Sequence, residues 1–591
     1  QAPCCGLKIW PRGIWLHKET WGQGHSGRMA VPTDISIISL LILIFYTGPM
    51  SITQPSQKGQ FFRPAGRSPL QPMRSATGIV AGLALACLLQ GCSGGSDDPV
   101  DRLKLQAENP TLEGPITSGG AADCCILDFF GFEVDLRTQG YAPGTPFYAG
   151  VLFDEAELGY LETEYFFSGT ATSYIARDEP RSDGIWSIQA ADAAPYNSRM
   201  VVLRPADDAD FNGTVVVEWF NVSGGLDAAP DWTQMHTELM RKGYAWVGVS
   251  AQRAGIEGGG PIDIPLKLVD PERYGSLDHP GDSFSYDIFS QAAQAVRNPV
   301  GLDPLDGLKV RRMIGVGQSQ SAHRLVTYIN AIHPTIALFD GFILHSRIIS
   351  GSAPLSQLPQ AEVPTPDRVL IRADLAEPVI SLQTETEIIR GNAPVARQAD
   401  SPSFRLWEVA GSSHADNYTS NVKGQLDRGD DPAVADVIET TAARAPFIYC
   451  DLPINDGPGH WVAKAAIATL DRWIANGQAP PSAPRLSLNS DGTGFELDEF
   501  GNAKGGVRTP YVDAPVAVLS GLGQQGDSFC GLYGTTALFD EATLARLYPD
   551  QATYVDAIDR AADAAVAAGF LLPPDAALIK QRARSSGIGA P

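Results

Sequence analysis

Residues 311–334 read RRMIGVGQSQSAHRLVTYINAIHP, an apolar run that turns at Gly317-Gln-Ser-Gln-Ser321 into a segment with helical spacing. A strand, a tight turn and a helix in this order are typical of a turn that lifts a serine above the end of a sheet. Gly317 and Ser321 are small at the two positions where a large side chain would collide with so sharp a turn. The pattern therefore predicts Ser319 as a nucleophile. An ordinary turn whose serines cap the following helix would show the same five letters.

The composition is that of a large globular protein. Of 591 residues, 44% are hydrophobic and 19% are charged, so a sizeable core is possible. The formal net charge of -23 comes from scattered acidic residues, and we therefore expect neither nucleic acid nor an anionic membrane surface as a partner. Since no metal-ligand cluster, phosphate loop or dinucleotide fingerprint is visible in the sequence, we predict no cofactor and no metal.

The N-terminal region is typical of a processed segment. Residues 73–91 begin at Met73-Arg74, continue through an apolar run and end in Leu-Gln-Gly before Cys92, as in a bacterial lipoprotein signal. We expect cleavage before Cys92, lipidation of this cysteine and a flexible tether over residues 92–130. Residues 1–72 are interpreted as an upstream extension that the mature protein lacks; a membrane anchor or transit segment at 35–46 is the alternative. The expected location is the cell envelope or the outside of the cell, with the lipid as the only membrane contact.

Four cysteines remain beyond Cys92 in the expected mature chain. Outside the cytoplasm disulfides can persist, and we expect Cys450 to pair with Cys530, which would join the C-terminal segment to the preceding domain. The adjacent Cys124 and Cys125 have no assigned partner, and sequence alone leaves the pairing open.

From about Gly159 onward, strand-like and helix-like segments alternate as in an α/β protein with a mostly parallel sheet. We expect strands at Thr214–Val222, Tyr244–Ser250, Arg311–Val316, Ile336–His345, Val379–Gln383 and Phe404–Val409, and helices at Trp232–Lys242, Asp287–Arg297 and Val462–Gly477. The main domain is placed at residues 131–485, ending in a Pro-rich stretch. Residues 486–591 form a C-terminal extension with helices expected at Glu541–Leu547 and Thr553–Ala568.

Acyl transfer by a serine requires a base and an acid that orients the base. Glu385 and Glu387 follow one predicted strand, and His414 follows the next in Gly-Ser-Ser-His-Ala-Asp. The order serine, acid, histidine along the chain, each after a strand, favours Ser319, one of the glutamates and His414 as the catalytic set. The usual spacing of the acid after its strand favours Glu387, and Glu385 is the alternative.

Other histidines are weaker candidates for the base. His460 opens the last helix of the main domain and is the second choice. His323 lies one turn beyond Ser319 on the predicted helix, where packing or capping is expected. His345 ends a strand and is a candidate substrate contact. In the expected mature chain the remaining three, His236, His279 and His333, have no motif around them.

Backbone donors for an oxyanion are expected on both sides of Ser319. One is the N–H of Gln320, the residue after the nucleophile. The other is expected from Asn221-Val-Ser-Gly-Gly225 after an apolar strand, with Val222 and Ser223 as the candidates. A plain Gly-rich turn is an equally good interpretation of that loop.

Four motifs resemble a bacterial family known as "alpha/beta hydrolase domain" proteins, from about Tyr160 to the C-terminus. They are EWFNVSGG at 218–225, YGSLDHPGDSFSYD at 274–287, GQSQS at 317–321 and WEVAGSSHAD at 407–416. The resemblance implies an α/β-hydrolase fold, a mostly parallel sheet flanked by helices, and a triad carried here by Ser319, Glu387 and His414. Ser321 in place of the usual glycine, and Glu rather than Asp as the acid, depart from the wider superfamily.

Together these features predict a secreted, lipid-anchored carboxylic ester hydrolase that works through an acyl-enzyme. The Gly- and Pro-rich segment 254–285 is expected to overhang the site, and its aromatics Tyr274 and Phe284, with Tyr286 just beyond, are candidates for the substrate pocket or for a purely structural role. The alternatives are an amidase or peptidase on the same triad, a non-catalytic binding protein of the cell envelope, and, more remotely, a lyase. The ester itself and the oligomeric state are undetermined by the sequence.

Overall fold

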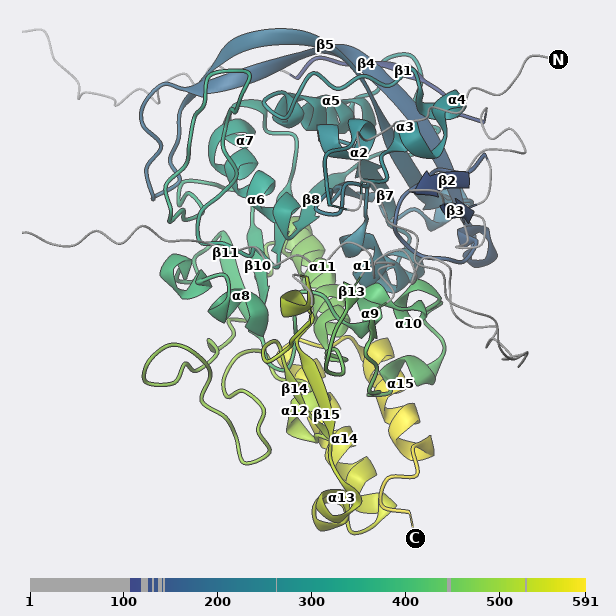
Figure 1. The fold of residues 1–591 in the computed structure, drawn as a ribbon, viewed down its shortest axis with the longest axis vertical. Helices are drawn as coiled ribbons and strands as arrows, with labels where there is room; N and C mark the ends of the chain where they lie inside the picture. The colour runs from purple at the N-terminus through teal and green to yellow at the C-terminus, as the bar shows by residue number, and fades with distance from the viewer. Residues whose placement is uncertain are drawn as a thin grey trace, which may run out of the picture.

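A nine-stranded sheet in the order β1-β4-β5-β7-β6-β8-β9-β10-β11 dominates the described part of the chain (Figure 1). The protein is represented by a computed structural model that describes residues 107–117, 126–129, 132–135, 141, 144–261, 263–443, 448–526 and 529–590. Within these ranges, no helix is both long enough and apolar enough to cross a membrane.

Six neighbouring strands of this sheet are parallel. They are β6 (Thr214–Trp219), β7 (Ala245–Val249), β8 (Arg312–Gln318), β9 (Gly341–His345), β10 (Val379–Thr384) and β11 (Phe404–Val409). Their near-continuous apolar sequences fit strands that are covered on both faces. Each overlaps a predicted strand, and the main deviation is β9, which starts five residues late because helix α7 (His333–Ile336) precedes it.

The other end of the sheet is antiparallel. Strands β4 (Tyr160–Ala176) and β5 (Ile188–Pro205) form a long hairpin that arches over the top of the molecule in Figure 1. Strand β1 (Thr111–Glu113) pairs with β4. The main sheet therefore begins inside the segment 92–130 that the sequence suggested as a tether, before the expected domain start at residue 131.

Helices cover both faces of the sheet. Helices α1 (Pro230–Arg241) and α11 (Gly459–Asn476) contact each other and pack on one face, where they bury residues such as Trp232 and Leu470. Helices α5 (Ser285–Arg297) and α6 (Gln320–Thr327) pack on the opposite face, into a second core that includes Phe289. The predicted arrangement, a mostly parallel sheet flanked by helices, is confirmed.

Three short helices replace the open loop that was expected between β7 and α5. They are α2 (Arg253–Glu257), α3 (Leu266–Val269) and α4 (Pro271–Tyr274). Ile256, Leu266 and Tyr274 from this segment pack against Phe166 of β4. The segment also touches the loop after β6, because the N–H of Asp263 donates to the carbonyl of Gly224 at 3.2 Å.

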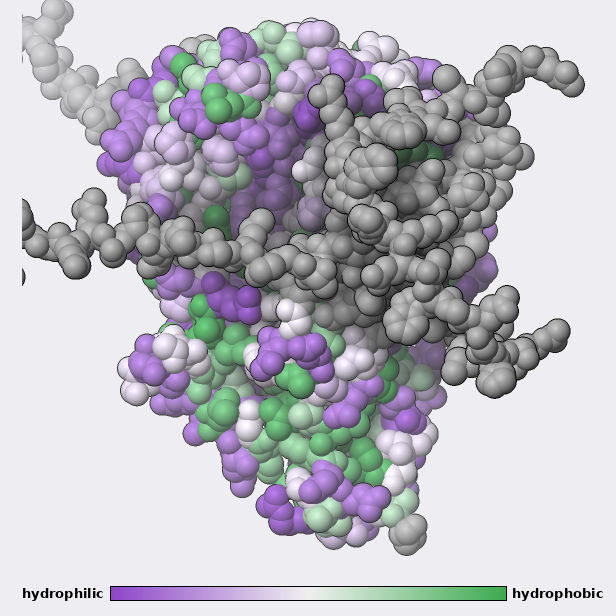
Figure 2. All heavy atoms as spheres, viewed as in Figure 1, coloured by the Kyte–Doolittle hydropathy of each residue, from purple (hydrophilic) through white to green (hydrophobic). Residues whose placement is uncertain are grey.

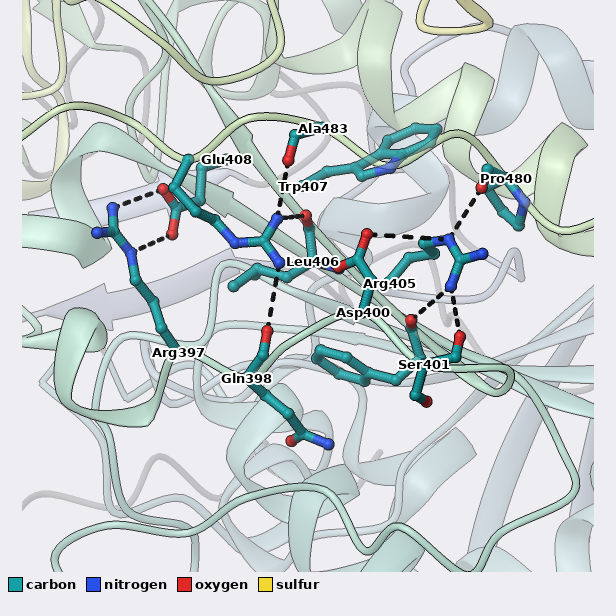
Figure 3. A network of polar contacts seen from close by, with 12 residues as sticks. Arg397, Gln398, Asp400, Ser401, Arg405, Leu406, Trp407, Glu408, Pro480 and Ala483 are labelled. Atoms are coloured by element: carbon teal, nitrogen blue, oxygen red, sulfur yellow. Dashed lines mark hydrogen bonds and ion pairs between the residues drawn. The ribbon is translucent and has the colours of Figure 1, made fainter.

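The outer edge of β11 is closed by side chains and by the C-terminal segment (Figure 3). The Arg485 guanidinium donates to the carbonyl of Leu406, and the N–H of Val507 donates to that of Glu408 at 2.6 Å. Arg397 holds the Glu408 carboxylate through two hydrogen bonds of 2.7 Å. An uncovered edge strand would offer free backbone groups to other chains, and this network prevents that.

The C-terminal extension forms the lower part of the molecule in Figure 1 and is joined to the rest by the expected disulfide between Cys450 and Cys530. Figure 2 shows apolar side chains gathered over this part, whereas the upper part of the same face is mostly hydrophilic where grey residues do not cover it. Its elements are α12 (Pro510–Asp513), β14 (Ala517–Ser520), β15 (Thr535–Leu538), α13 (Glu541–Leu547), α14 (Gln551–Ala568) and α15 (Pro573–Ser585). The smaller elements elsewhere are β2 (Ile126–Phe129), β3 (Phe132–Asp135), β12 (Ala442–Ala443), β13 (Ile448–Tyr449), α8 (Glu385–Ile389), α9 (Asn417–Ser420) and α10 (Val422–Gln425).

Candidate active site

Ser319 lies at the tip of the turn between β8 and α6, with φ 62° and ψ -119°. A positive φ is uncommon for a residue other than glycine, and such backbone strain is concentrated at functional sites. The strain persists because buried elements hold both sides of the turn. The predicted strand-turn-helix geometry around Ser319 is therefore present.

The two small residues that flank Ser319 fit this turn for different reasons. A Cβ atom at Gly317 would lie 3.0 Å from the Cβ of Ser321, so only glycine fits without displacing a neighbour. Ser321 is buried, and its Oγ donates a hydrogen bond to the carbonyl of Phe220 at 3.1 Å. The serine in place of the second glycine thus links α6, through a hydrogen bond, to the end of β6.

His414 stands between Ser319 and Glu387. Its Nε2 lies 2.8 Å from Ser319 Oγ, and its Nδ1 lies 2.6 Å from Glu387 Oε1. Because an ionised carboxylate only accepts hydrogen bonds, Nδ1 carries a hydrogen and Nε2 of the neutral ring is left to accept from the serine hydroxyl. All three side chains are at least nine-tenths buried.

Glu387 is held by the first turn of α8. Its Oε2 accepts hydrogen bonds from both the N–H and the hydroxyl of Thr384, each at 2.6 Å, in a capping box. Burial alone would raise the pKa of Glu387, but the hydrogen bond and charge of His414, together with the two bonds from Thr384, bring it below its ordinary value. Glu387 is therefore ionised at neutral pH, as a carboxylate that orients a histidine must be.

Glu385, the alternative acid, points elsewhere. Its carboxylate accepts hydrogen bonds from the N–H of Gly411 at 2.7 Å and from the N–H of Gly521 at 2.9 Å. Burial raises the pKa of Glu385 to about 7, although these hydrogen bonds oppose the increase. Of the two adjacent glutamates, the structure brings only Glu387 to His414.

The backbone of His414 is fixed from two directions. Its N–H donates to Thr386 Oγ1 at 3.1 Å, and its carbonyl accepts from Gln318 Nε2 at 3.1 Å. The next N–H, that of Ala415, donates to the carbonyl of Leu532 in the C-terminal extension at 3.0 Å. Sequence reasoning missed Thr386 and Gln318, because neither lies in a motif that signals contact with a histidine loop.

Two backbone N–H groups remain as candidates for an oxyanion site. Gln320 opens α6, where the first N–H groups have no acceptor within the helix. In the described part of the chain, the Val222 N–H donates to no other atom. The Ser223 N–H, by contrast, donates to Asn221 Oδ1 at 2.8 Å, so the prediction for Ser223 is corrected. Asn221, which sequence reasoning did not single out, also donates from Nδ2 to the carbonyl of Gln318 at 3.0 Å.

The three aromatic residues suggested for a substrate pocket are in the core. Tyr274 is fully buried, and its hydroxyl donates to Glu164 Oε1 at 3.2 Å. Phe284, the residue before α5, is buried in the core, and the Tyr286 hydroxyl donates to the carbonyl of Pro354 at 2.8 Å. The suggestion that these rings line a pocket is therefore corrected, because burial and hydrogen bonding give them structural roles.

The competing histidines also have partners away from Ser319 Oγ. His345 places Nδ1 2.7 Å from Asp231 Oδ1 and is buried, although its carbonyl accepts from the Ser319 N–H at 2.9 Å. His460 stacks on Tyr418 with ring centroids 3.6 Å apart. His323 Nε2 accepts from the N–H of Ile349 at 3.2 Å. None of these three rings is hydrogen-bonded to the nucleophile.

Several predictions lie outside the described residues, namely the signal segment, the lipidated Cys92 and the cysteines 124 and 125. Within the ranges that the structure covers, no group of three or more His, Cys, Asp or Glu side chains is arranged to hold a metal ion.

Comparison with known proteins identifies one family. A family model described as "Alpha/beta hydrolase domain" matches residues 112–581. No curated protein matches the chain.

Solved structures with similarity to the chain include three hydrolases. A glucuronoyl esterase from Solibacter usitatus is 10% identical, with 42% of this chain and 76% of that chain covered and a TM-score of 0.23. A serine hydrolase from Xanthomonas campestris is 13% identical, with 40% and 83% covered and a TM-score of 0.21. A rice cell wall degrading esterase from Xanthomonas oryzae is 14% identical, with 32% and 45% covered and a TM-score of 0.19. At these TM-scores the three structures carry no further argument.

Proposed function

Because the chain belongs to the alpha/beta hydrolase domain family, we propose that it is a serine hydrolase that cleaves carboxylic esters through an acyl-enzyme. The single observation that supports this most directly is the position of His414, whose two ring nitrogens lie 2.8 Å from Ser319 Oγ and 2.6 Å from Glu387 Oε1. A base between a serine and an ionised carboxylate is the arrangement that activates a hydroxyl for attack on a carbonyl.

In the proposed acylation step, Ser319 Oγ attacks the ester carbonyl while His414 Nε2 takes the hydroxyl proton. The positive charge that forms on His414 is stabilised by Glu387, which Thr384 keeps in place. The backbone N–H groups of Gln320 and Val222 are the proposed donors to the oxyanion. His414 then returns the proton to the alcohol that leaves, and an acyl-Ser319 remains.

Deacylation repeats the sequence with water. His414 Nε2 takes a proton from a water molecule, the hydroxide attacks the acyl carbonyl, and Ser319 Oγ leaves with the proton from His414. The acid product is released and the resting state is regenerated, so that no redox partner or cofactor takes part in the proposed cycle.

Carboxylic esters are preferred over amides in this proposal on chemical grounds. An alkoxide is a better leaving group than an amide nitrogen. Cleavage of an ester therefore depends less on proton donation by the single general acid, His414. Matched p-nitrophenyl acetate and p-nitroacetanilide distinguish the two classes. Hydrolysis of the ester alone supports the proposal, whereas comparable turnover of the anilide would favour the amidase alternative.

The experiment that tests the nucleophile is labelling with a fluorophosphonate probe, followed by mapping of the modified peptide. We expect the wild-type protein to be labelled at Ser319, and Ser319→Ala and His414→Ala to lose the label. His460→Gln is the matched control, because it removes the second-choice base and should leave labelling intact. A folded wild-type protein that takes no label would contradict the proposal and favour a non-catalytic binding protein.

The proposed location rests on the sequence alone. We propose that the mature chain begins at a lipidated Cys92 and acts in the cell envelope, because Met73-Arg74, the apolar run and Leu-Gln-Gly-Cys92 follow the order of a lipoprotein signal. Mass spectrometry of the membrane fraction tests it: a diacylated N-terminal Cys92 peptide is expected, and Cys92→Ser should remain unprocessed. An unmodified peptide that spans residues 90–94 would contradict the proposal.

A further inference from the structure

A small cavity lies between the sheet and the loops that follow β9 and β10. Its floor includes Ser381 and Gln383, which point to the same face of β10 because they are two residues apart on a strand. Arg347, just after β9, and Ile388 of α8 belong to the opposite wall. The cavity is distinct from the catalytic set, whose Ser319, His414 and Glu387 do not line it.

Three buried polar side chains of this cavity each have at least one polar group without a partner among the described residues. Arg347, Ser381 and Gln383 are only 5–6% exposed. Among the described residues, neither the hydroxyl of Ser381 nor either end of the Gln383 amide forms a hydrogen bond, and Gln383 Oε1 is fully buried. Buried polar groups are almost always hydrogen-bonded, either to protein or to a bound water molecule or ion. The three groups therefore indicate a polar occupant.

Arg347 supplies the charge that defines this occupant. Its Nε donates to the carbonyl of Gly351 at 3.0 Å, and its Nη2 donates to the carbonyl of Val369 at 2.9 Å and to those of Ser350 and Gly351. Nη1 has no acceptor in the described part of the chain. Burial lowers the pKa of Arg347 to about 10, so the guanidinium remains charged at neutral pH.

No carboxylate of the described residues forms an ion pair with Arg347. The buried arginines of the described residues are Arg199, Arg204, Arg273, Arg324, Arg347 and Arg372. All of them except Arg347 form an ion pair with Asp or Glu. A buried cation without a counter-ion is costly, and a bound anion removes that cost.

The rest of the cavity wall confirms the charge balance. Figure 3 shows Arg397 and Glu408, the other two charged lining residues, joined to each other by two hydrogen bonds of 2.7 Å. Two arginines and one glutamate leave one positive charge, and it belongs to Arg347. The nearby Gln398 is satisfied, since its amide makes hydrogen bonds of 2.9 and 3.0 Å with the backbone of Ile371.

We propose that this cavity is a binding site for a small monovalent anion of the halide class, chloride in the first instance, held by Arg347 Nη1, the Gln383 amide and the Ser381 hydroxyl. A small spherical anion suits a cavity whose remaining wall is mainly aliphatic, with Leu344, Ile371 and Leu406. Water would satisfy the two neutral groups but would leave the charge on Arg347 uncompensated.

Occupancy of this site would stabilise the loops after β9 and β10, which lie next to the catalytic residues. Ile388 follows Glu387 directly on α8, and Arg347 holds the loop whose Ile349 N–H donates to His323 at 3.2 Å. The anion would bridge β10, which leads into the loop of the acid, and the loop after β9. We expect it to act on stability, independently of whether the chain hydrolyses esters.

The test is thermal unfolding of the full protein with sodium chloride exchanged for sodium gluconate at constant ionic strength, since gluconate is too large for the cavity. We expect Tm to rise saturably with chloride, by about 1–3 °C at about 200 mM. Bromide should act like chloride. A Tm that depends on ionic strength alone would overturn the proposal.

Gln383→Met keeps the length of the side chain but removes the amide, and it should abolish the chloride-dependent part of the shift. Ser381→Ala is a smaller change and should weaken the chloride-dependent shift. It replaces Gln383→Met as the test if that variant fails to fold. Gln294→Met on α5 is the matched control, since Gln294 is also buried (4% exposed) but does not line the cavity. Its chloride response should equal that of the wild type.

Crystals soaked in sodium bromide give a direct readout. An anomalous peak within about 3.5 Å of Arg347 Nη1 and the Gln383 amide is the expected result. Water alone at this place, in crystals that show bromide elsewhere, would overturn the proposal.

Discussion

Glu385 Oε2 accepts a hydrogen bond from the backbone N–H of Gly521 at 2.9 Å, although 136 residues separate the two in sequence. The other carboxylate oxygen accepts from the N–H of Gly411, three residues before His414. Thr386, next to Glu385, donates its hydroxyl to the carbonyl of Gly521 at 2.8 Å and accepts from the N–H of His414. The C-terminal extension and the histidine loop are therefore joined through the first turn of α8.

The pH dependence of stability should reveal Glu385. Burial raises its pKa to about 7 from the ordinary value of 4.5, so between these pH values the folded state keeps a proton that the unfolded state has lost. The folded state binds more protons, and the free energy of unfolding must therefore fall as pH rises through this window. Glu385→Gln cannot lose a proton and should lack this decrease.

Urea unfolding of both proteins at several values between about pH 4.5 and 8 measures the difference. The stability advantage of the wild type over Glu385→Gln should be largest at the acidic end and constant above about pH 8. The exposed Glu496→Gln serves as the control and should run parallel to the wild type. Parallel curves for Glu385→Gln as well would contradict the raised pKa.

Substitution of Glu387 should reduce activity much more than substitution of Glu385. Glu387→Gln keeps the shape of the side chain but loses the charge that fixes the tautomer of His414, so kcat should fall by about 10³–10⁴-fold. Glu385→Gln touches only the scaffold of the loop, and a loss of no more than about 10-fold is expected. Turnover of p-nitrophenyl acetate by the two variants measures this. Equal losses would mean that Glu387 has no special role as the acid.

Part of this site could be predicted from the sequence because it is local. The strand, the small residues and the helix around Ser319 are encoded in one short stretch, and chain order gives the acid and the base. The preference for Glu387 over Glu385 followed from spacing after a strand, and the structure places Glu387, and not Glu385, at His414. Both glutamates are buried, however, which adjacent glutamates in a sequence do not indicate.

The residues that were missed act through contacts between distant segments. Asn221 and Gln318 are joined across 97 residues, and Thr386 reaches Gly521 across 135. Neither pairing leaves a periodic or compositional signal. Tyr274 shows the converse problem, because an aromatic residue in a Gly-rich segment fits a pocket or a core equally well until Glu164 is seen beside it. Strand β1, with three residues, is too short to show alternation.

Asn221 should matter for catalysis more than for folding. Its side chain links the loop that carries the Val222 N–H to the carbonyl of Gln318 directly before Ser319. Asn221→Ala removes this link and the bond to the Ser223 N–H, so the two proposed oxyanion donors lose their relative position. We expect kcat to fall by about 10–100-fold with little change in KM.

Asn212 provides a matched control at the other end of the same strand. Its Oδ1 accepts from the N–H two residues on, that of Thr214, at 2.7 Å, and its Nδ2 donates to the carbonyl of Lys242 at 2.9 Å. Asn212→Ala thus removes the same kind of turn and should cost about 1–2 kcal/mol of stability without a change in kcat. Equal kinetic losses in both variants would show that Asn221 acts only through folding.

The disulfide should stabilise the fold and the histidine loop together. Cys450 and Cys530 are 80 residues apart, and Cys530 lies two residues before Leu532, whose carbonyl accepts from the Ala415 N–H beside His414. A cross-link over a loop of this length contributes about 2–4 kcal/mol, largely by restricting the unfolded chain. The variant with both Cys450→Ala and Cys530→Ala should therefore unfold at a lower temperature.

Because Leu532 then loses its anchor, fluorophosphonate labelling of Ser319 should also slow, by about 2–10-fold. Calorimetry and labelling on the same samples separate the two effects. A lower Tm with an unchanged labelling rate would show that the hydrogen bond between Ala415 and Leu532 survives without the cross-link. An unchanged Tm would contradict the stabilising role of the disulfide.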